Sequence, residues 1–388
     1  MTVFRHLVSR IAAACLAVVL VLVCSPEWVA AQQVQTPKPQ KVQKKAKPKA
    51  KAKAIAKAKV VLGKALGNTP AVKALASRLS TEHQLPKAWV QQQIASARLL
   101  PQVQQMVLPP LTPTAKNWQA YRARFLQADR IQAGVAFARK YTDELQRAEV
   151  NYGVPKAYVL GVLGVETFFG QHQGQFKVLD ALATLSMAFP KEHPYASERQ
   201  AFFENELGHH LQQLREQPSL KHQLGSFAGA SGWPQFMPSS IAKFAVDFDG
   251  DGRIDLSRSP VDAIGSVAHY FQAYGWQTGM PTHFEVKVNA NEADLAALLA
   301  PDIVPSWSLA HLQDKGVEVA DAAGHPKPLA LVQLFNADDP PSYVAGTENF
   351  FVITRYNRSS YYALAVIELG LAVENAMALA GDTKAACP

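Results

Sequence analysis

The chain has 388 residues, 48% of them hydrophobic and 18% charged, so it is long enough to bury a core and is not a disordered protein. Its net charge of +8 resembles that of a nucleic-acid-binding protein. However, ten lysines fall between Lys38 and Lys59, and without them the charge is −2. The folded part is therefore slightly acidic, and nucleic acid is excluded as its partner.

The N-terminal segment has the pattern of an export signal. Basic Arg5 and Arg10 precede the apolar run 11–23, and small residues end the segment at Ala31. We predict a signal peptide over residues 1–31 and a periplasmic location. The alternative of a retained anchor is weaker, because a bilayer span needs about 20 apolar residues.

The cysteines limit lipidation and disulfide formation. Val23 precedes Cys24, where a lipoprotein needs a small residue, so an outer-membrane lipoprotein is less favoured. Cys15 and Cys24 lie in the predicted signal, and Cys387 is then the only cysteine of the mature chain. An internal disulfide and a cysteine-based metal site are excluded.

Residues 32–63 form a segment rich in Lys, Ala and Pro, in which charge repulsion and lack of burial predict a disordered linker. A plain spacer is one interpretation. Weak electrostatic contact with an anionic wall or membrane surface is the other.

From residue 64 onward helical periodicity dominates. Ile131, Val135, Ala138, Leu145 and Ala148 lie on one apolar face and predict one helix that Gly153 ends. A second helix is predicted over 155–169, from Pro155 to the residue before Gly170.

The next part of the chain has strand patterns. The apolar runs 284–288, 329–335 and 350–354 are separated by Pro, Gly and Asp clusters, and a final helix is predicted over 361–380. The predicted fold is mainly α with a smaller β-rich section. Residues 64–388 would form one catalytic region, with a helical core over 115–283 and the β-rich section over 284–355.

Glu166 is a candidate general acid. It follows Val159, Val162 and Leu163 by seven, four and three residues, so the same helix stripe carries all four side chains. Desolvation raises a carboxyl pKa and holds a glutamic acid protonated near neutral pH. The alternative is a glutamate at the edge of the stripe that reaches solvent.

The segment 225–240 combines three glycines, two prolines and small residues, which favours a loop with exposed backbone. Ser226 and Gln235 could donate hydrogen bonds to sugar hydroxyls, and Trp233 and Phe236 could stack on sugar rings. A tightly packed structural loop has the same composition.

The segment 247–255 has the spacing of a calcium-binding loop, with acids at positions 1, 3, 5 and 9 and glycine at position 6: Asp247, Asp249, Asp251, Asp255 and Gly252. Position 12 is Arg258 instead of the usual glutamate, and Asp262 is the nearest acid. A hydrated acidic turn without an ion is the alternative, although clustered carboxylates repel one another.

Several segments in order over residues 115–375 resemble the lytic murein transglycosylase B family, glycoside hydrolase family 103. They are Tyr152-Gly-Val-Pro155, Gly161-Val-Leu-Gly-Val-Glu-Thr167, Leu179-Asp-Ala-Leu-Ala-Thr-Leu185, Ser226-Phe-Ala-Gly-Ala230, Gln235-Phe-Met-Pro-Ser-Ser240, Asp262-Ala-Ile-Gly-Ser-Val267 and Ile353-Thr-Arg-Tyr-Asn357. The resemblance implies a goose-lysozyme-like core with added α and β parts, and it places Glu166 at the catalytic position.

The resemblance also implies binding residues. The positions matching glycan contacts are Tyr121, Arg199, Ser226, Gln235, Tyr270, Tyr356, Asn357 and Tyr362. Those matching the family's calcium loop are Asp247, Asp249, Asp251, the carbonyl of Arg253, and Asp262. Two segments depart from the family pattern. Trp233-Pro234 changes the expected shape of its subsite, and the longer segment 190–199 changes the surroundings expected for Arg199.

The activity implied is cleavage of the β-1,4 bond between N-acetylmuramic acid and N-acetylglucosamine in peptidoglycan. The reaction would use one carboxyl group and leave 1,6-anhydro ends, with structural Ca²⁺ and no organic cofactor. We expect a monomer that binds glycan strands. A muramidase that leaves reducing ends is the alternative enzyme, and an inactive wall-binding scaffold is the alternative outside enzymes.

Overall fold

The computed structural model of the protein describes residues 60–110 and 115–385, with side chains up to residue 379. The predicted signal peptide 1–31, the greater part of the predicted linker and Cys387 lie outside the described residues. The described part is mainly helical with a smaller antiparallel sheet, as predicted. Three hydrophobic clusters of buried side chains divide it.

The end of the predicted linker 32–63 belongs to the fold. The Val61 N–H donates to Gln102 Oε1 at 3.1 Å, and the Gly63 N–H donates to the Leu99 carbonyl at 2.8 Å. The predicted boundary was therefore too late. Backbone pairing with a distant segment orders these residues, and composition does not reveal such pairing.

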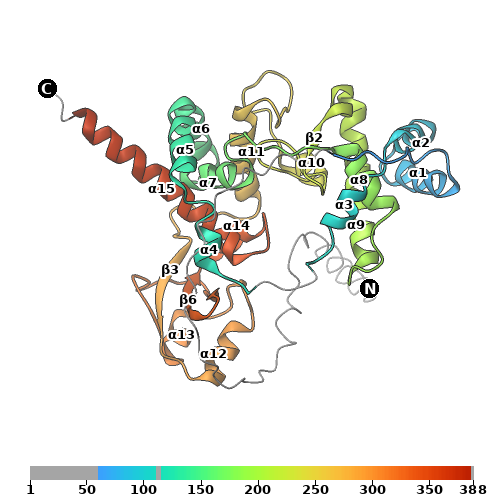
Figure 1. Ribbon diagram of the computed structural model, residues 1–388. Coiled ribbons are helices and arrows are strands. Elements are labelled where there is room, and N and C mark those ends of the chain that lie inside the picture. Colours follow the sequence, from blue (N-terminus) through green and yellow to red (C-terminus); the bar gives the residue numbers. More distant parts are fainter. Residues whose placement is uncertain (1–59, 111–114, 386–388) are drawn as a thin grey trace, which may run out of the picture.

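Five helices share the first core cluster: α1 (Pro70–Glu82), α2 (Lys87–Ser96), α3 (Pro101–Met106), α8 (Val178–Met187) and α9 (Ala196–Glu216). Thr69 caps α1 by accepting a hydrogen bond from the Val72 N–H. Figure 1 shows these helices on one side of the molecule. The helices thus begin with α1, as the helical periodicity from residue 64 onward predicted, and they extend before the predicted helical core 115–283.

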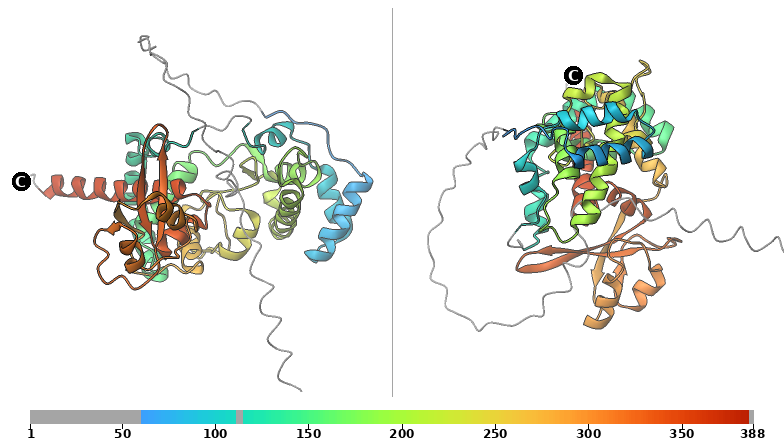
Figure 2. Two further views of the ribbon diagram at one scale, coloured as in Figure 1. Left: turned by 90° about the horizontal axis from the view of Figure 1, so that it is seen from below. Right: turned by 90° about the vertical axis from the view of Figure 1, so that its right-hand side faces the viewer.

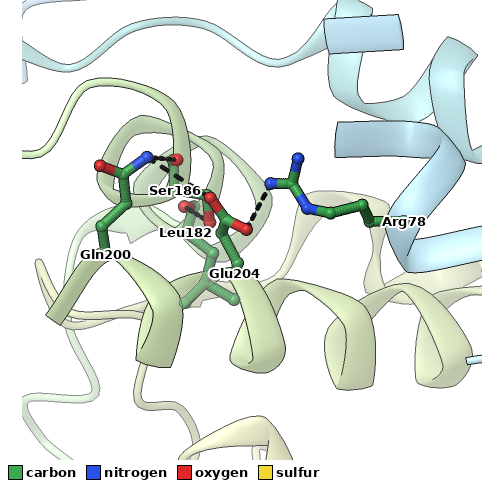
Figure 3. A network of polar contacts seen from close by, with 5 residues as sticks. All are labelled: Arg78, Leu182, Ser186, Gln200 and Glu204. Atoms are coloured by element: carbon green, nitrogen blue, oxygen red, sulfur yellow. Dashed lines mark hydrogen bonds and ion pairs between the residues drawn. The ribbon is translucent and has the colours of Figure 1, made fainter. Parts of the chain in front are cut away.

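A polar network joins three of these helices (Figure 3). Arg78 of α1 pairs with Glu204 of α9 at 2.6 Å. Gln200 of α9 donates to the Ser186 carbonyl of α8 at 2.9 Å and to Glu204 at 3.4 Å. These contacts fix α1 against α9 beside the buried apolar contacts.

The second cluster contains the helices that carry the candidate site: α4 (Trp118–Arg122), α5 (Ala128–Lys140), α6 (Thr142–Tyr152), α7 (Lys156–Thr167), α11 (Pro260–Ala273) and α15 (Ser360–Ala385). They lie on the other side of Figure 1, where the C-terminal end of α15 projects beyond its neighbours. The short α10 (Pro238–Phe244) contacts both α9 and α11.

The single helix predicted before Gly153 is wrong, because the structure has two helices that meet at Tyr141. Basic residues end α5, and the acidic Asp143 and Glu144 begin α6. These charges stabilise the C-terminal end of one helix dipole and the N-terminal end of the next, which favours two helices over one. Gly153 does end α6, in the left-handed region at a φ of 69°.

Helices α7 and α15 approach closely at two glycines. A Cβ atom at Gly161 would lie 2.0 Å from the Val366 carbonyl oxygen, and one at Gly370 would lie 1.9 Å from the Ala157 carbonyl oxygen. Glycine is therefore required at both positions. Residues 360–379 are apolar enough to span a membrane by composition, but half of this stretch is buried, and α15 packs on α7.

The third cluster lies under a four-stranded antiparallel sheet in the order β4-β3-β6-β5, seen below the helices in Figure 1 and in the right-hand view of Figure 2. Its strands and covering helices are β3 (His283–Val288), β4 (Val317–Val319), β5 (Ala330–Asn336), β6 (Asp339–Gly346), α12 (Glu292–Leu299) and α13 (Leu309–Asp314).

The predicted strand 350–354 is instead helix α14 (Glu348–Thr354). Thr347 caps it by accepting from the backbone N–H of Asn349 and Phe350. A short apolar run buried on all sides does not distinguish strand from helix, which explains the error.

Candidate active site

Glu166 lies in the last turn of α7, and its side chain is half-buried. The Tyr362 hydroxyl at the start of α15 donates to Glu166 Oε1 at 2.6 Å. Burial raises the Glu166 pKa to about 7 from an ordinary 4.5, while the hydrogen bond from Tyr362 acts in the opposite direction. Because burial has the larger effect, this carboxyl can hold or release a proton near neutral pH.

Four tyrosines from separate elements surround this carboxyl: Tyr121, Tyr270, Tyr356 and Tyr362. Burial is the main cause that raises the pKa of each, and the Glu166 charge raises all four further. The structure thus brings four of the predicted glycan-binding residues to the candidate acid. Each phenol stays protonated and can donate a hydrogen bond.

The tyrosine rings are held in fixed positions. The Tyr270 hydroxyl donates to the Arg355 carbonyl at 2.6 Å, and that of Tyr356 donates to the Pro234 carbonyl at 2.5 Å. The ring centroids of Tyr356 and Tyr362 are 6.1 Å apart with an interplanar angle of 17°. The site is therefore rigid on this side.

The loop 225–240 is fixed by its own polar side chains. Ser226 Oγ accepts from the N–H of Ala228 and Ala230, at 3.3 and 3.1 Å. Gln235 Nε2 donates to the carbonyls of Gln173 and Gly232, at 3.2 and 2.9 Å. Both predicted binding residues therefore also shape the loop.

The aromatic residues of that loop support the alternative of a packed structural loop. Phe236 is 2% exposed and packs on Tyr270 and Tyr356, so it cannot stack on a sugar. Trp233 is half-buried against the Phe137 ring, with centroids 5.5 Å apart. Composition alone could not show which face the two rings occupy.

One contact that sequence reasoning missed joins this loop to α7. Thr167 Oγ1 donates to the Trp233 carbonyl at 2.9 Å and accepts from the Gly170 N–H at 3.0 Å. Thr167 thereby ties the end of the helix that carries Glu166 to the loop. Its position directly after Glu166 was the only available sequence signal.

Two predicted binding residues have polar atoms without partners in the described part of the chain. The buried Asn357 Oδ1 and Arg199 Nε make no hydrogen bond there. Asn357 follows Tyr356 directly. Arg199 lies in the first turn of α9, a helix of the first core cluster. Burial lowers the Arg199 pKa. No hydrogen bond or ion pair among the described residues joins Arg199 to Glu166.

The predicted metal loop brings three carboxylates together. Asp247, Asp249 and Asp251 each place one ligand atom within 4.8 Å of the others. The loop is shaped by Asp247, which accepts from the N–H of Gly250 and Gly252, both at 2.8 Å. Three clustered hard oxygens fit Ca²⁺.

Asp262 does not join these three carboxylates. Its Oδ1 accepts from the N–H of Phe248 and Asp249, and its Oδ2 accepts from Asp255 N–H at 2.8 Å. Asp262 is buried, at 1% exposure. It holds the two ends of the loop together, a role that spacing alone could not separate from metal ligation.

Comparison with known proteins agrees with these features. Residues 67–371 match the family described as Transglycosylase SLT domain. The chain is 38% identical over 322 residues to the membrane-bound lytic murein transglycosylase B of Escherichia coli K12, covering 80% of this chain and 85% of the relative.

Solved structures of the Escherichia coli lytic transglycosylase Slt35 are also similar. The complex with bulgecin A has a TM-score of 0.71 and 36% identity, covering 81% of this chain and 97% of that one. The complex with calcium has a TM-score of 0.70 and 34% identity over the same shares.

Proposed function

We propose that Glu166 is the single catalytic acid and base of this protein, which belongs to the transglycosylase SLT domain family. As a member of this family, the chain is a lytic transglycosylase that cleaves peptidoglycan. The observation that carries this proposal is a carboxyl group with a pKa of about 7 among four tyrosines. A group that titrates near the working pH can both donate and accept a proton.

In the first step, protonated Glu166 donates its proton to the oxygen of the β-1,4 bond between N-acetylmuramic acid and N-acetylglucosamine. The C1–O bond breaks, and the N-acetylglucosamine part leaves as an alcohol. Positive charge develops at C1 of the muramic acid, and the N-acetyl oxygen of that sugar stabilises it. The Tyr362 hydroxyl holds the new carboxylate in place.

In the second step, the Glu166 carboxylate takes the proton of the C6 hydroxyl of the same muramic acid. The C6 oxygen bonds to C1 and forms the 1,6-anhydro ring, so no water is consumed. Hydrolysis usually employs two carboxyl groups. The Glu166 pKa responds to burial and to Tyr362, and no second carboxyl group of the described residues perturbs it. Membership of the lytic transglycosylase family favours the intramolecular reaction over a muramidase.

The remaining predicted residues would bind the glycan strand. The Tyr121 hydroxyl would donate to the reacting sugar, whereas Tyr270 and Tyr356, whose hydroxyls donate to backbone carbonyls, would shape the wall of the subsite. The unpaired amide oxygen of Asn357 suits an N–H group of an N-acetyl substituent. Ser226, Gln235 and Tyr362 complete the set, and Arg199 would take a carboxylate of a peptide stem farther along the strand.

The carboxylates of Asp247, Asp249 and Asp251, with the Arg253 carbonyl, would hold a structural Ca²⁺ ion. The ion supplies positive charge that offsets the repulsion among these carboxylates. Asp262 would organise the loop from behind, through backbone hydrogen bonds. A similar protein, Slt35, has been solved with calcium. No step of the reaction passes through the ion.

The enzyme would act in the periplasm, exported by the signal sequence 1–31, with glycan strands as its partner. Its relative is a membrane-bound enzyme, which supports a place in the cell envelope.

Digestion of purified sacculi tests the proposed reaction. The wild-type protein should release muropeptides with 1,6-anhydro ends, identified by mass spectrometry. The folded Glu166→Gln variant should lose more than about a hundredfold of this activity, because an amide cannot transfer the proton. Reducing ends would favour a muramidase, and an active variant would remove Glu166 from the mechanism.

A further inference from the structure

Arg130, in the first turn of α5, contacts the end of α7 on both sides of Glu166. Its Nη1 donates to the Gly164 carbonyl at 2.5 Å. Its guanidinium carbon lies 4.4 Å from the ring centroid of Phe168. The two contacts fall two residues before and two residues after the glutamate, so one side chain brackets it.

The helix end that Arg130 contacts has an unusual backbone. Phe168 and Phe169 have φ angles of 53° and 52°, in the left-handed region that non-glycine residues avoid. The Phe168 N–H donates to the Gly164 carbonyl at 3.2 Å, and the Phe169 N–H donates to the Leu163 carbonyl at 3.0 Å. Two consecutive residues persist in this conformation only where their surroundings hold them.

Packing supplies part of that restraint. A Cβ atom at Gly134 of α5 or at Gly164 of α7 would lie 2.8 Å from the Phe169 ring, so this ring fills a slot between the helices. The Phe168 ring is only partly buried at the edge of the same core cluster. The guanidinium of Arg130 covers it and also lies 5.3 Å from the Phe125 ring.

The cost of burying this guanidinium indicates that its contacts matter. Burial lowers the Arg130 pKa, and Arg130 Nε is buried without a hydrogen-bond partner among the described residues. The charge is retained beside the last carbonyls of a helix, where the helix dipole favours a cation. The planar group also stacks on an aromatic face, which the ammonium of lysine does less well.

We propose that Arg130 is a positioning residue that fixes the end of α7, and through it the carboxyl group of Glu166, against the reacting bond. It acts through the Gly164 carbonyl and the Phe168 ring and does not touch the substrate. The proposal rests on the proposed role of Glu166, because the geometry of an acid matters most where a proton must be transferred.

The test compares kcat and KM of purified variants on glycan fragments, with calcium present throughout. Arg130→Met should lower kcat about tenfold to a hundredfold and change KM less than about twofold. Arg130→Lys should recover part of kcat, because an ammonium can donate to the Gly164 carbonyl. Water entering the loosened helix end should also lower the Glu166 pKa, so the alkaline limb of the kcat profile should move to lower pH.

Arg147→Met is the matched control. Arg147 also donates to a backbone carbonyl, that of Phe248 at 2.6 Å, and its guanidinium lies 4.1 Å from the Phe248 ring. It should lose thermal stability to a similar extent as Arg130→Met while kcat stays within about twofold. If Arg130→Met does not fold, Phe168→Leu replaces it, since leucine removes only the stacked ring, and it should lower kcat with the same shift of the alkaline limb.

Wild-type kcat and an unmoved alkaline limb in a folded Arg130 or Phe168 variant would overturn the proposal and leave only a structural role. A higher KM with unchanged kcat would overturn it too, because Arg130 would then be a substrate contact. Full activity of Glu166→Gln would instead refute the proposed catalytic role itself, so the two failures are distinguishable.

Discussion

Replacing Glu166 by Gln should change the pH dependence of folding stability as well as activity. Burial raises the pKa of this carboxyl to about 7 in the folded protein, whereas in the unfolded chain it should be near 4.5. The folded state therefore penalises the ionised form. At about 1.4 kcal/mol per pKa unit, the penalty is at most about 3.5 kcal/mol.

The sign follows from proton binding. Below pH 4.5 the carboxyl is protonated in both states, so its ionisation costs no stability. Between pH 4.5 and about 7 the unfolded state ionises first, and the wild-type protein loses stability relative to the variant. Above about pH 7 the full penalty is present. The variant should therefore gain up to about 3.5 kcal/mol relative to wild type between acidic and alkaline pH.

Urea unfolding of both proteins across this pH range measures the difference directly. Other titrating groups are common to both proteins and cancel in the comparison, and the glutamine oxygen can still accept from Tyr362. Glu192→Gln, at an exposed glutamate, controls for the loss of one charge. If the difference in the free energy of unfolding between wild type and Glu166→Gln does not change with pH, burial does not raise the pKa of the Glu166 carboxyl.

Three further predictions concern the hydrogen bond to Glu166, the carboxylate loop 247–251 and the packing of α7 on α15. Tyr362→Phe should lower kcat about tenfold and, because its hydrogen bond lowers the Glu166 pKa, move the alkaline limb of the pH profile to higher pH; an unmoved limb would contradict this. Calcium should raise the thermal midpoint of the wild-type protein and chelation should lower it, whereas the midpoint of Asp251→Ala should not change with calcium. If calorimetry shows no calcium binding to the wild type, the loop is only a hydrated turn. Gly161→Ala should lower the free energy of unfolding by about 1 to 3 kcal/mol, measured in urea, because its methyl group would meet the Val366 carbonyl; unchanged stability would show that α7 and α15 can separate without cost.

The sequence determined the fold class because long helices follow from local periodicity. The apolar stripe made Glu166 a candidate but left open a glutamate that reaches solvent, and the family resemblance selected it. It also predicted the cluster of three carboxylates, because Asp247, Asp249 and Asp251 are neighbours in the chain and need no tertiary contact to meet. Where local signals were ambiguous, the predictions failed. The segment 350–354 forms a helix, and one predicted helix is divided at Tyr141.

Only the tertiary structure decided how the site is assembled. Tyr362 reaches Glu166 across 196 positions of the chain, and Arg130 reaches Gly164 from another helix. By its spacing Asp262 could be either a metal ligand or a brace of the loop, and the structure adds that both of its carboxylate oxygens accept from backbone N–H groups of the loop. Such contacts depend on how whole helices pack, because the free energy that brings distant residues together comes from burying the shared core and not from the residues that meet.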